Sequence, residues 1–531
     1  MFNSIRSGTT SVATLASKRT AICAAILATG VIAVFPAQAQ SALGNYAGDL
    51  IVSTTNYVDP NFLVGTALPI STGANAGSSS AFCSNADCSV NVWNNSAQDA
   101  NFGVTGSINI QNVNATTGAV DNTVNVTSLA AAQGVTLTNS FASKSELAVN
   151  LSADGKSVTF MGYNSAAGKI DVSNANTPGI IEPGNTDTAA ATYRSIGQLN
   201  LSSNALQVTN TNAYAGNNGR SVVQGSNGNY YAVGNAGNGN GSAAVTAATG
   251  VQLIVPGSTP GATSNVGAYS IAQNGYAADK TAKDNNFRGE TIFNNTLYVT
   301  KGSGSNGINT VYQVGTAGSL PGAGNATPIS ILPGFNTTLA KTNTATPHPF
   351  GIWFANASTL YVADEGSGAS TDFGASPTTT AGGLQKYSLV GGAWQLDYTL
   401  KGNLIGSAYT VNGTGSLAGD SVTTTTDGLR NLTGKVNADG TVTLYATTST
   451  EGSALGDAGA DPNKLVSITD TLGYTTAAQA SAENFNDLQT ASLGTVIRGV
   501  AITPVPEPSE YLMMILGLGF LGFAASRRKS K

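Results

Sequence analysis

The central part of this sequence predicts an all-β fold. Short apolar segments alternate with Gly, Asn and Asp turns, and no long segment has convincing helical periodicity. One unit recurs, consisting of an apolar strand, a tight turn, and a second strand with an aromatic-aliphatic run. The two ends of the region each contain half of such a unit. These observations predict a repetitive β structure that closes on itself.

Five copies of the unit are complete. Their first and second strands are predicted at 147–151 and 157–160, 219–223 and 230–233, 287–293 and 296–299, 350–354 and 359–363, and 428–432 and 442–446. A third strand follows at 196–201, 251–255, 310–314, 384–389 and 464–468. Asp154-Gly155, Asn227-Gly228 and Asp439-Gly440 are predicted to form two-residue hairpin turns, because these residues tolerate positive φ angles.

The ends of the region predict how the structure closes. Residues 496–502 resemble a first strand with no second strand, and 48–53 resemble a second strand with no first. Pairing them would complete one sheet and remove exposed edges, which predicts a β-propeller with six visible blades. A seventh blade in the Ser- and Ala-rich segments, or a β-solenoid or adhesin-like stack, is the alternative. The Leu-Tyr-Val strands resemble those of NHL- and YVTN-type propellers.

The first 39 residues have the pattern of a secretory signal peptide. The apolar run 20–35 follows the basic residues Arg6, Lys18 and Arg19. After it, Ala37-Gln38-Ala39 provides the small residues that signal peptidase requires. We therefore expect cleavage after Ala39 and a region from 40 to 503 that folds outside the cytoplasm.

The C-terminal segment, 504–531, contains a second address. Pro506-Glu507-Pro508 precedes the uncharged apolar stretch 511–525, and Arg527, Arg528 and Lys529 follow it. Fifteen helical residues span only about 22 Å, against about 30 Å of hydrocarbon, so this helix would be held only transiently in a membrane. The basic residues would stay on the cytoplasmic side.

This order of features resembles the PEP-CTERM sorting signal, over roughly the last 25 residues. The resemblance implies recognition by an exosortase of a Gram-negative bacterium that makes exopolysaccharide, and cleavage near Pro506-Glu507-Pro508. It also implies release or transfer to the cell envelope, the cell surface or the extracellular matrix. An ordinary C-terminal membrane anchor is the alternative.

Composition is consistent with such an address. Charged residues make up 10% of the chain and the net charge is −5. Loss of the signal and of everything after Pro508 removes seven basic residues and one acidic residue, which changes the net charge to −11. Nucleic-acid binding is excluded because it requires clustered Lys and Arg. Cys83 and Cys88 remain after processing and are predicted to form a disulfide in an oxidising compartment.

Four arginines occupy equivalent places in the repeat. Arg220, Arg288, Arg430 and Arg498 stand at or near the start of the first strand, where Phe350 stands in a fifth copy. In a propeller these positions converge on the central channel. The arginines either bind an anionic ligand such as a carboxylate, phosphate or acidic sugar, or tie the blades together through neighbouring carboxylates and carbonyls.

Other polar residues indicate no metal site or catalytic set. The only histidine, His348, lies between two prolines and is interpreted as a loop residue. A histidine-based zinc site is excluded, because the remaining ligands would have to be carboxylates or the two paired cysteines. Calcium on the acidic loops at Asp364-Glu365 and Asp457–Asp461 is an alternative to ordinary polar turns, and no other cofactor is expected.

We therefore expect an exported, exosortase-processed propeller that is not an enzyme. Its role would be structural or ligand-binding, with extracellular polysaccharide as partner and a link to exopolysaccharide or biofilm. The alternative is a secreted hydrolase, for example a lactonase-like enzyme, which would require Glu290, Asp364 and Asp427 to converge.

Overall fold

The computed structural model describes residues 42–504, with gaps at 58–67, 70–78, 81–104 and 452–460 and several shorter ones. The predicted signal cleavage site at Ala37 and Ala39 lies outside the described residues. The same holds for Cys83 and Cys88, and for the C-terminal segment with Pro506, Glu507, Pro508, Arg527, Arg528 and Lys529. All elements below belong to the unit Ala42–Lys531.

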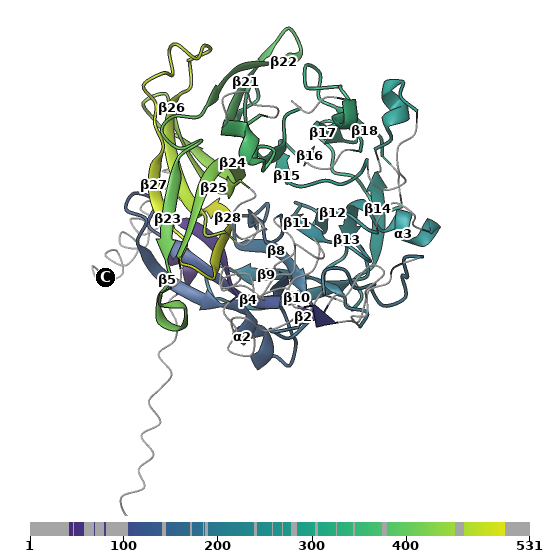
Figure 1. Ribbon diagram of the computed structural model, residues 1–531. Helices are drawn as coiled ribbons and strands as arrows, with labels where there is room; N and C mark the ends of the chain where they lie inside the picture. Colours follow the sequence, from purple (N-terminus) through teal and green to yellow (C-terminus); the bar gives the residue numbers. More distant parts are fainter. Residues whose placement is uncertain are drawn as a thin grey trace, which may run out of the picture. The chain divides into compact units, whose positions relative to one another are not determined.

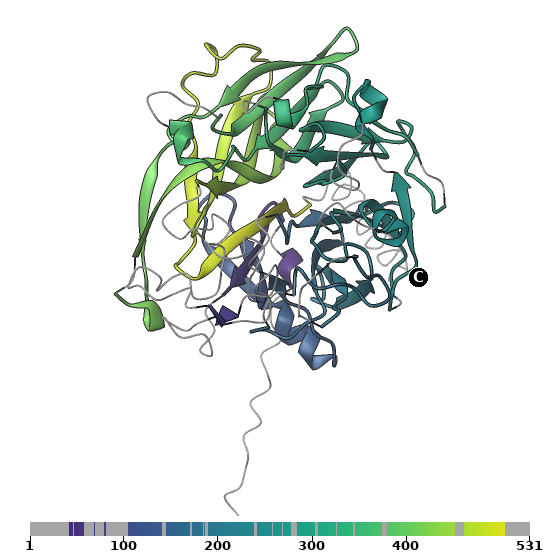
Figure 2. The same ribbon diagram turned by 45° about the vertical axis from the view of Figure 1, so that its right-hand side comes forward.

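Six antiparallel sheets surround a common axis, so the described chain is a six-bladed β-propeller (Figures 1 and 2). From the axis outward, blade 1 is β28 (Thr495–Ile502), β1 (Leu50–Asn56), β4 (Thr105–Val113) and β5 (Val120–Asn125), with β6 (Asn139–Ser140) beside β4. Blade 2 is β7 (Asn150–Leu151), β8 (Ser157–Tyr163), β9 (Arg194–Asn200) and β10 (Leu206–Thr211). Blade 3 is β11 (Gly219–Gln224), β12 (Tyr230–Gly234), β13 (Gly250–Ile254) and β14 (Thr263–Gly267).

The remaining blades follow in chain order. Blade 4 is β15 (Glu290–Phe293), β16 (Thr296–Lys301), β17 (Thr310–Val314) and β18 (Ile329–Ile331). Blade 5 is β19 (Pro349–Asn356), β20 (Thr359–Asp364), β21 (Gly383–Val390) and β22 (Ala393–Leu400). Blade 6 contains β24 (Ser421–Val436), β25 (Thr441–Thr450), β26 (Lys464–Thr471) and β27 (Asn486–Thr490), and β23 (Ala408–Asn412) pairs with the first part of β24.

The predicted closure is confirmed. β1 pairs with β28 in antiparallel register from Leu50 opposite Ile502 to Asn56 opposite Thr495. Just outside the pair, the backbone N–H of Thr503 donates to the carbonyl of Asp49 at 2.8 Å. Blade 1 is thus built from both ends of the described chain, and the solenoid alternative is wrong.

The apolar core lies between blades rather than in one central mass. Each of six buried clusters joins two adjacent blades, and the last joins blades 6 and 1 through residues such as Tyr445 and Leu50. The apolar side chains on the two faces of a blade are therefore buried by packing against the neighbouring blades. Ring closure packs blade 6 on blade 1 and covers the two sheet faces that an open row of blades would leave exposed.

Three hairpin turns differ from the prediction. Two-residue turns of this type require positive φ at both positions, and among the described residues Asn294-Asn295 and Gly391-Gly392 meet this requirement. At Asp154-Gly155, Asn227-Gly228 and Asp439-Gly440 only the glycine has a positive φ, and four or five residues separate the strands. Longer loops were missed because the glycine alone is compatible with both geometries.

The helices are short and peripheral. They are α2 (Val126–Ala132), α3 (Ala243–Ala247) and the 3-10 turns η1 (Leu43–Asn45), η4 (Ile271–Asn274), η5 (Ala340–Thr342), η6 (Ser370–Phe373) and η7 (Gly415–Leu417). A separate two-stranded ladder consists of β2 (Leu68–Pro69) and β3 (Ser79–Ser80). Within the described part of the chain, none of these helices has the length and apolar character needed to span a bilayer.

Candidate functional site

The inner strands of all six blades surround an axial cavity of about 580 Å³. At one end, the cavity reaches the hairpin-turn residues Ser226, Asn294 and Asn295. At the other end it reaches Ser221 and Glu290. Its volume lies within the range of about 300–1,000 Å³ that is usual for small-ligand sites.

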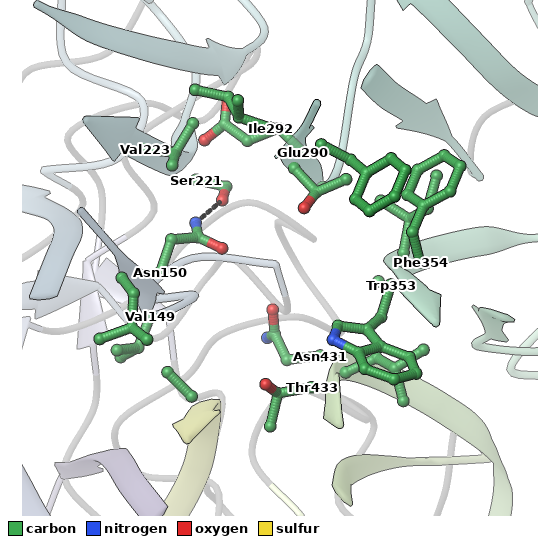
Figure 3. Close-up of a pocket in the computed structure, with 18 of the residues that line it drawn as sticks. Val149, Asn150, Ser221, Val223, Glu290, Ile292, Trp353, Phe354, Asn431 and Thr433 are labelled. Atoms are coloured by element: carbon green, nitrogen blue, oxygen red, sulfur yellow. Dashed lines mark hydrogen bonds between the residues drawn. The ribbon is translucent and has the colours of Figure 1, made fainter. Parts of the chain in front are cut away.

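The cavity wall combines neutral polar groups with aromatic and aliphatic surface (Figure 3). Asn150 donates from Nδ2 to Ser221 Oγ at 2.9 Å and to the carbonyl of Val222 at 3.1 Å. Asn431 and Thr433 face the cavity from β24, and Trp353 lies beside them on β19. Amides beside an indole ring provide hydrogen bonds and an apolar face, which together suit a sugar ring.

Glu290 is the one ionisable side chain among the described residues that line the cavity. It is only 5% exposed, and neither carboxyl oxygen has a hydrogen-bond partner. Figure 3 shows the side chain pointing into the cavity from the start of β15. Burial raises the pKa of Glu290 well above the ordinary value, and the nearby Ser221 hydroxyl opposes this shift.

The four predicted arginines converge at the Glu290 end of the axis, but none of them is among the described residues that line the cavity. Arg220 Nε and Arg288 Nη1 both donate to Ser145 Oγ, at 2.9 and 2.5 Å. Arg220 Nη1 also bonds Asn286 Oδ1 and the carbonyl of Phe287. These contacts tie blades 3 and 4 to the segment that precedes blade 2.

The other two arginines have different partners. Arg430 Nε lies 3.1 Å from Glu365 Oε2, and Arg498 Nη2 donates to Tyr57 Oη at 2.7 Å. The guanidinium of Arg498 also lies over the Tyr57 ring, 5.9 Å from its centroid. Arg220, Arg430 and Arg498 are therefore engaged by protein groups, whereas the Nε atom of Arg288 is buried and has no hydrogen-bond partner.

Glu146 is a member of this cluster that the sequence did not reveal. Its Oε1 accepts a hydrogen bond from the Tyr163 hydroxyl. Burial raises its pKa to about 8, although the Tyr163 hydrogen bond, Arg498 and Arg194 all act in the opposite direction. Neither Glu146 nor Tyr163 falls in a repeated position of the unit, so no pattern in the sequence indicated them.

Glycines explain why the arginines come so close together. Gly289 and Gly499 each follow an arginine, and both press against a neighbouring inner strand. A Cβ on Gly289 would lie 2.2 Å from the Phe350 carbonyl oxygen, and one on Gly499 would lie 2.4 Å from the Val149 nitrogen. The Arg-Gly pairs at 288–289 and 498–499 are thus the signal in the sequence for these two close approaches, and the other two arginines lack it.

The carboxylates named for a hydrolase separate into two places. Asp364 and Asp372 lie close enough to Asp427 to affect its pKa, whereas Glu290 lies on the cavity wall. Burial raises the pKa of Asp427 to about 8, and Asp372 and Asp364 add to that shift. Asp364 Oδ1 accepts from the backbone N–H of His348 at 3.1 Å and of Gly366 at 3.0 Å.

A metal site is not formed by these groups. Among the described residues, no three His, Cys, Asp or Glu side chains are arranged to hold a metal ion. Of the second acidic loop, Asp461 accepts a hydrogen bond from Thr424 Oγ1, and Asp457 lies outside the described residues.

Comparison with known protein families identifies a sorting motif at the C-terminus. Residues 504–529 match the PEP-CTERM protein-sorting motif. The motif implies export towards the cell envelope or surface and processing by an exosortase. No curated protein shows significant sequence similarity to this chain.

Among the solved structures similar to this chain is one from Thermus thermophilus, described as a putative oxidoreductase (glucose dehydrogenase). It is 12% identical, with a TM-score of 0.29 over 64% of this chain and 87% of that chain. Similarity at this level carries no argument about function. Whether the propeller is of the NHL or YVTN type stays a prediction.

Proposed function

We propose that this protein is a non-enzymatic binding module of the cell surface or extracellular matrix of a Gram-negative bacterium. It is delivered there by its two terminal signals and binds a glycan in the axial cavity, as part of an exopolysaccharide or biofilm matrix. The observation that carries the proposal is the cavity wall, where amide, hydroxyl and indole groups face one space in a protein with an export motif.

The chemistry of the wall supports a sugar more than a flat apolar ligand. Asn150, Ser221, Asn431 and Thr433 supply neutral donors and acceptors, and Trp353 supplies a face for stacking. An exported protein of net charge −11 also has little non-specific attraction to acidic polymers. Selection by hydrogen bonds and stacking is therefore expected.

Binding is tested on the processed protein isolated from the envelope or the medium. Calorimetry with oligosaccharides from the producer's own polysaccharide is expected to detect binding, and Trp353→Ala to weaken it by about tenfold or more. Tyr276→Ala, a partly buried aromatic residue that does not line the cavity, is the control. Equal affinity of the wild type and Trp353→Ala would contradict the proposal.

Sorting is tested separately from binding. Removal of residues 504–531 is expected to abolish exosortase processing and retention at the normal destination, which intact-mass analysis and cell fractionation measure. Neutral substitution of Arg527, Arg528 and Lys529 should have a similar effect, because these residues hold the tail on the cytoplasmic side. Normal processing and normal amounts of the truncated chain would refute this route.

The arginine cluster is a second candidate location for a ligand with an anionic group. Its support is the unpartnered Nε of Arg288 in a cluster that contains four guanidinium groups. Arg288→Gln would then reduce affinity for an acidic oligosaccharide and leave a neutral one unaffected. Unchanged affinity for both would assign these arginines to blade assembly alone.

A secreted hydrolase is the second candidate function. The observation in its favour is the Asp364, Asp372 and Asp427 group, in which Asp427 has a pKa near 8 and could act as an acid. Asp427→Asn would then abolish glycoside or lactone hydrolysis by the processed protein. Absence of turnover in the wild type with a panel of both substrate classes would remove this candidate.

A further inference from the structure

The cavity contains a feature that a neutral sugar does not require. Glu290 is buried, has no hydrogen-bond partner, and is the one ionisable group among the described lining residues. Leaving a buried carboxyl unpaired is unfavourable, and more so if it is charged. An Asn or Gln at this position would also hydrogen-bond to a neutral sugar, without a charge.

The groups around Glu290 offer no countercharge inside the cavity. Asn150, Ser221, Asn431 and Thr433 are neutral, and Val223 and Ile292 are apolar. Tyr214 lies within electrostatic range of both Glu290 and Arg220. Arg220 and Arg288 precede cavity residues on β11 and β15, but their guanidinium groups donate to Ser145, Asn286 and the carbonyl of Phe287.

We propose that the axial cavity selects a sugar with a free, protonated amine, whose ammonium group pairs with the Glu290 carboxylate. This inference rests on the proposed glycan-binding function and names the class of sugar. An ammonium group supplies three donors and one positive charge, which match two unpartnered carboxyl oxygens. The Trp353 ring, on another part of the same cavity wall, provides a face for the sugar ring.

Binding of the ammonium group changes the ionisation of Glu290. Before the sugar binds, burial favours the protonated, uncharged form of the Glu290 carboxyl and raises its pKa. When the ammonium group enters, Glu290 ionises and its proton passes to the solvent, while the amine keeps its own proton. No bond other than the O–H of Glu290 is broken.

The experiment compares two probes that differ only at the amine. Calorimetry on the processed protein uses the trisaccharide of glucosamine and the trisaccharide of N-acetylglucosamine, each in two buffers with different ionisation enthalpies. We expect the glucosamine trimer to bind at least about tenfold more tightly. We also expect its binding to release protons, because the ammonium group favours the ionised form of Glu290.

Glu290→Gln removes the charge and keeps the shape of the side chain. In this variant the preference for the amine and the proton release should both disappear, while the N-acetylated trimer binds as before. Glu182→Gln makes the same change at a buried glutamate that is absent from the described cavity wall; it is the matched control and should leave the preference intact.

The outcomes separate this inference from the function on which it rests. Equal binding of both trimers, or an amine preference that survives in Glu290→Gln, overturns the amine assignment and leaves glycan binding standing. If neither trimer binds but a neutral oligosaccharide of the native polysaccharide does, the amine assignment also fails alone. If none of these sugars binds, both proposals fail.

Discussion

Two buried charged sites in this molecule differ in how completely their partners are supplied. Between blades 5 and 6, Lys386 Nζ lies 2.8 Å from Asp470 Oδ2, with exposures of 1% and 0%. Lys386 also bonds Tyr398 Oη and the carbonyls of Thr471 and Leu472, at 2.9–3.1 Å. At the axis, by contrast, Glu290 is also buried and its carboxyl group has no partner.

The difference distinguishes a structural from a binding role. The Asp470 carboxylate accepts from the hydroxyls of Tyr361 and Tyr398, so both of its oxygens and the Lys386 ammonium group have partners within the protein. Such a site specifies which surfaces meet, and nothing remains for a ligand to add. The axial carboxyl lacks these partners and lines a cavity, so a ligand can supply them.

The largest expected effect comes from breaking the complete site. Lys386→Met leaves the Asp470 carboxylate buried without its cation, which should lower the free energy of unfolding by about 3–5 kcal/mol. Urea denaturation measures it. The control is Lys464→Met, which removes the more exposed ion pair with Asp487 and should cost about 1 kcal/mol or less.

A double variant sharpens the same test. Lys386→Met combined with Asp470→Leu removes both charges, and we expect it to recover much of the lost stability. If the double variant is no more stable than Lys386→Met, the loss arises from packing rather than from an unpaired carboxylate.

A neutral interblade contact should have a smaller effect. Thr300 Oγ1 donates to the Phe350 carbonyl at 2.6 Å and accepts from the Gly289 N–H at 3.0 Å, which joins blades 4 and 5. Thr300→Val keeps the shape and loses both bonds, at a cost of about 1–3 kcal/mol. Thermal unfolding measures the change, and Thr300→Ser is the control that keeps the hydroxyl.

Buried carboxyl groups with raised pKa values should make stability depend on pH. Asp427 has a folded pKa of about 8, above its ordinary value of 3.8, so the folded state binds more protons between these values. Its contribution is present below about pH 4 and is lost as pH rises towards 8, with a slope of at most about 1.4 kcal/mol per pH unit. Asp427→Asn should flatten the measured slope between pH 5 and 8.

An exposed carboxyl group provides the contrast with the buried Asp427. Asp439, which is fully exposed, has a lowered pKa because Thr441 donates to it from both its side chain and its backbone. Asp439→Asn should therefore leave the slope between pH 5 and 8 unchanged. A slope that is unaltered in Asp427→Asn as well would show that the carboxyl titrates normally.

The smallest expected effect is that of Glu290→Gln on stability. Because no protein group depends on the Glu290 carboxyl, its replacement should leave the free energy of unfolding unchanged or raise it by about 1 kcal/mol at neutral pH. Urea denaturation at pH 7 measures it beside Lys386→Met. A loss comparable to that of Lys386→Met would mean that Glu290 is structural, and the comparison would fail.

The local features of the repeat were predictable because they depend on nearby residues. Alternating apolar residues and Gly or Asn turns identified the inner, second and third strands of blades 2 to 6, and the split unit identified the pairing of β1 with β28. The third strand of blade 1, β4, was missed. The predicted strand bounds were less accurate next to residues with an unusual backbone conformation. Residues 147–151 were predicted as a strand, yet β7 is only Asn150–Leu151, because Leu147 has a positive φ of 66°.

By itself, the sequence determined the address of this protein and the architecture of a six-bladed ring, since targeting motifs and strand periodicity are written in contiguous residues. It also placed four arginines near one axis. Only the tertiary structure decided that Arg220, Arg430 and Arg498 are engaged by Ser145, Glu365 and Tyr57. It alone also decided that Glu290 faces a cavity without a partner, because burial and pairing depend on residues far apart in the chain.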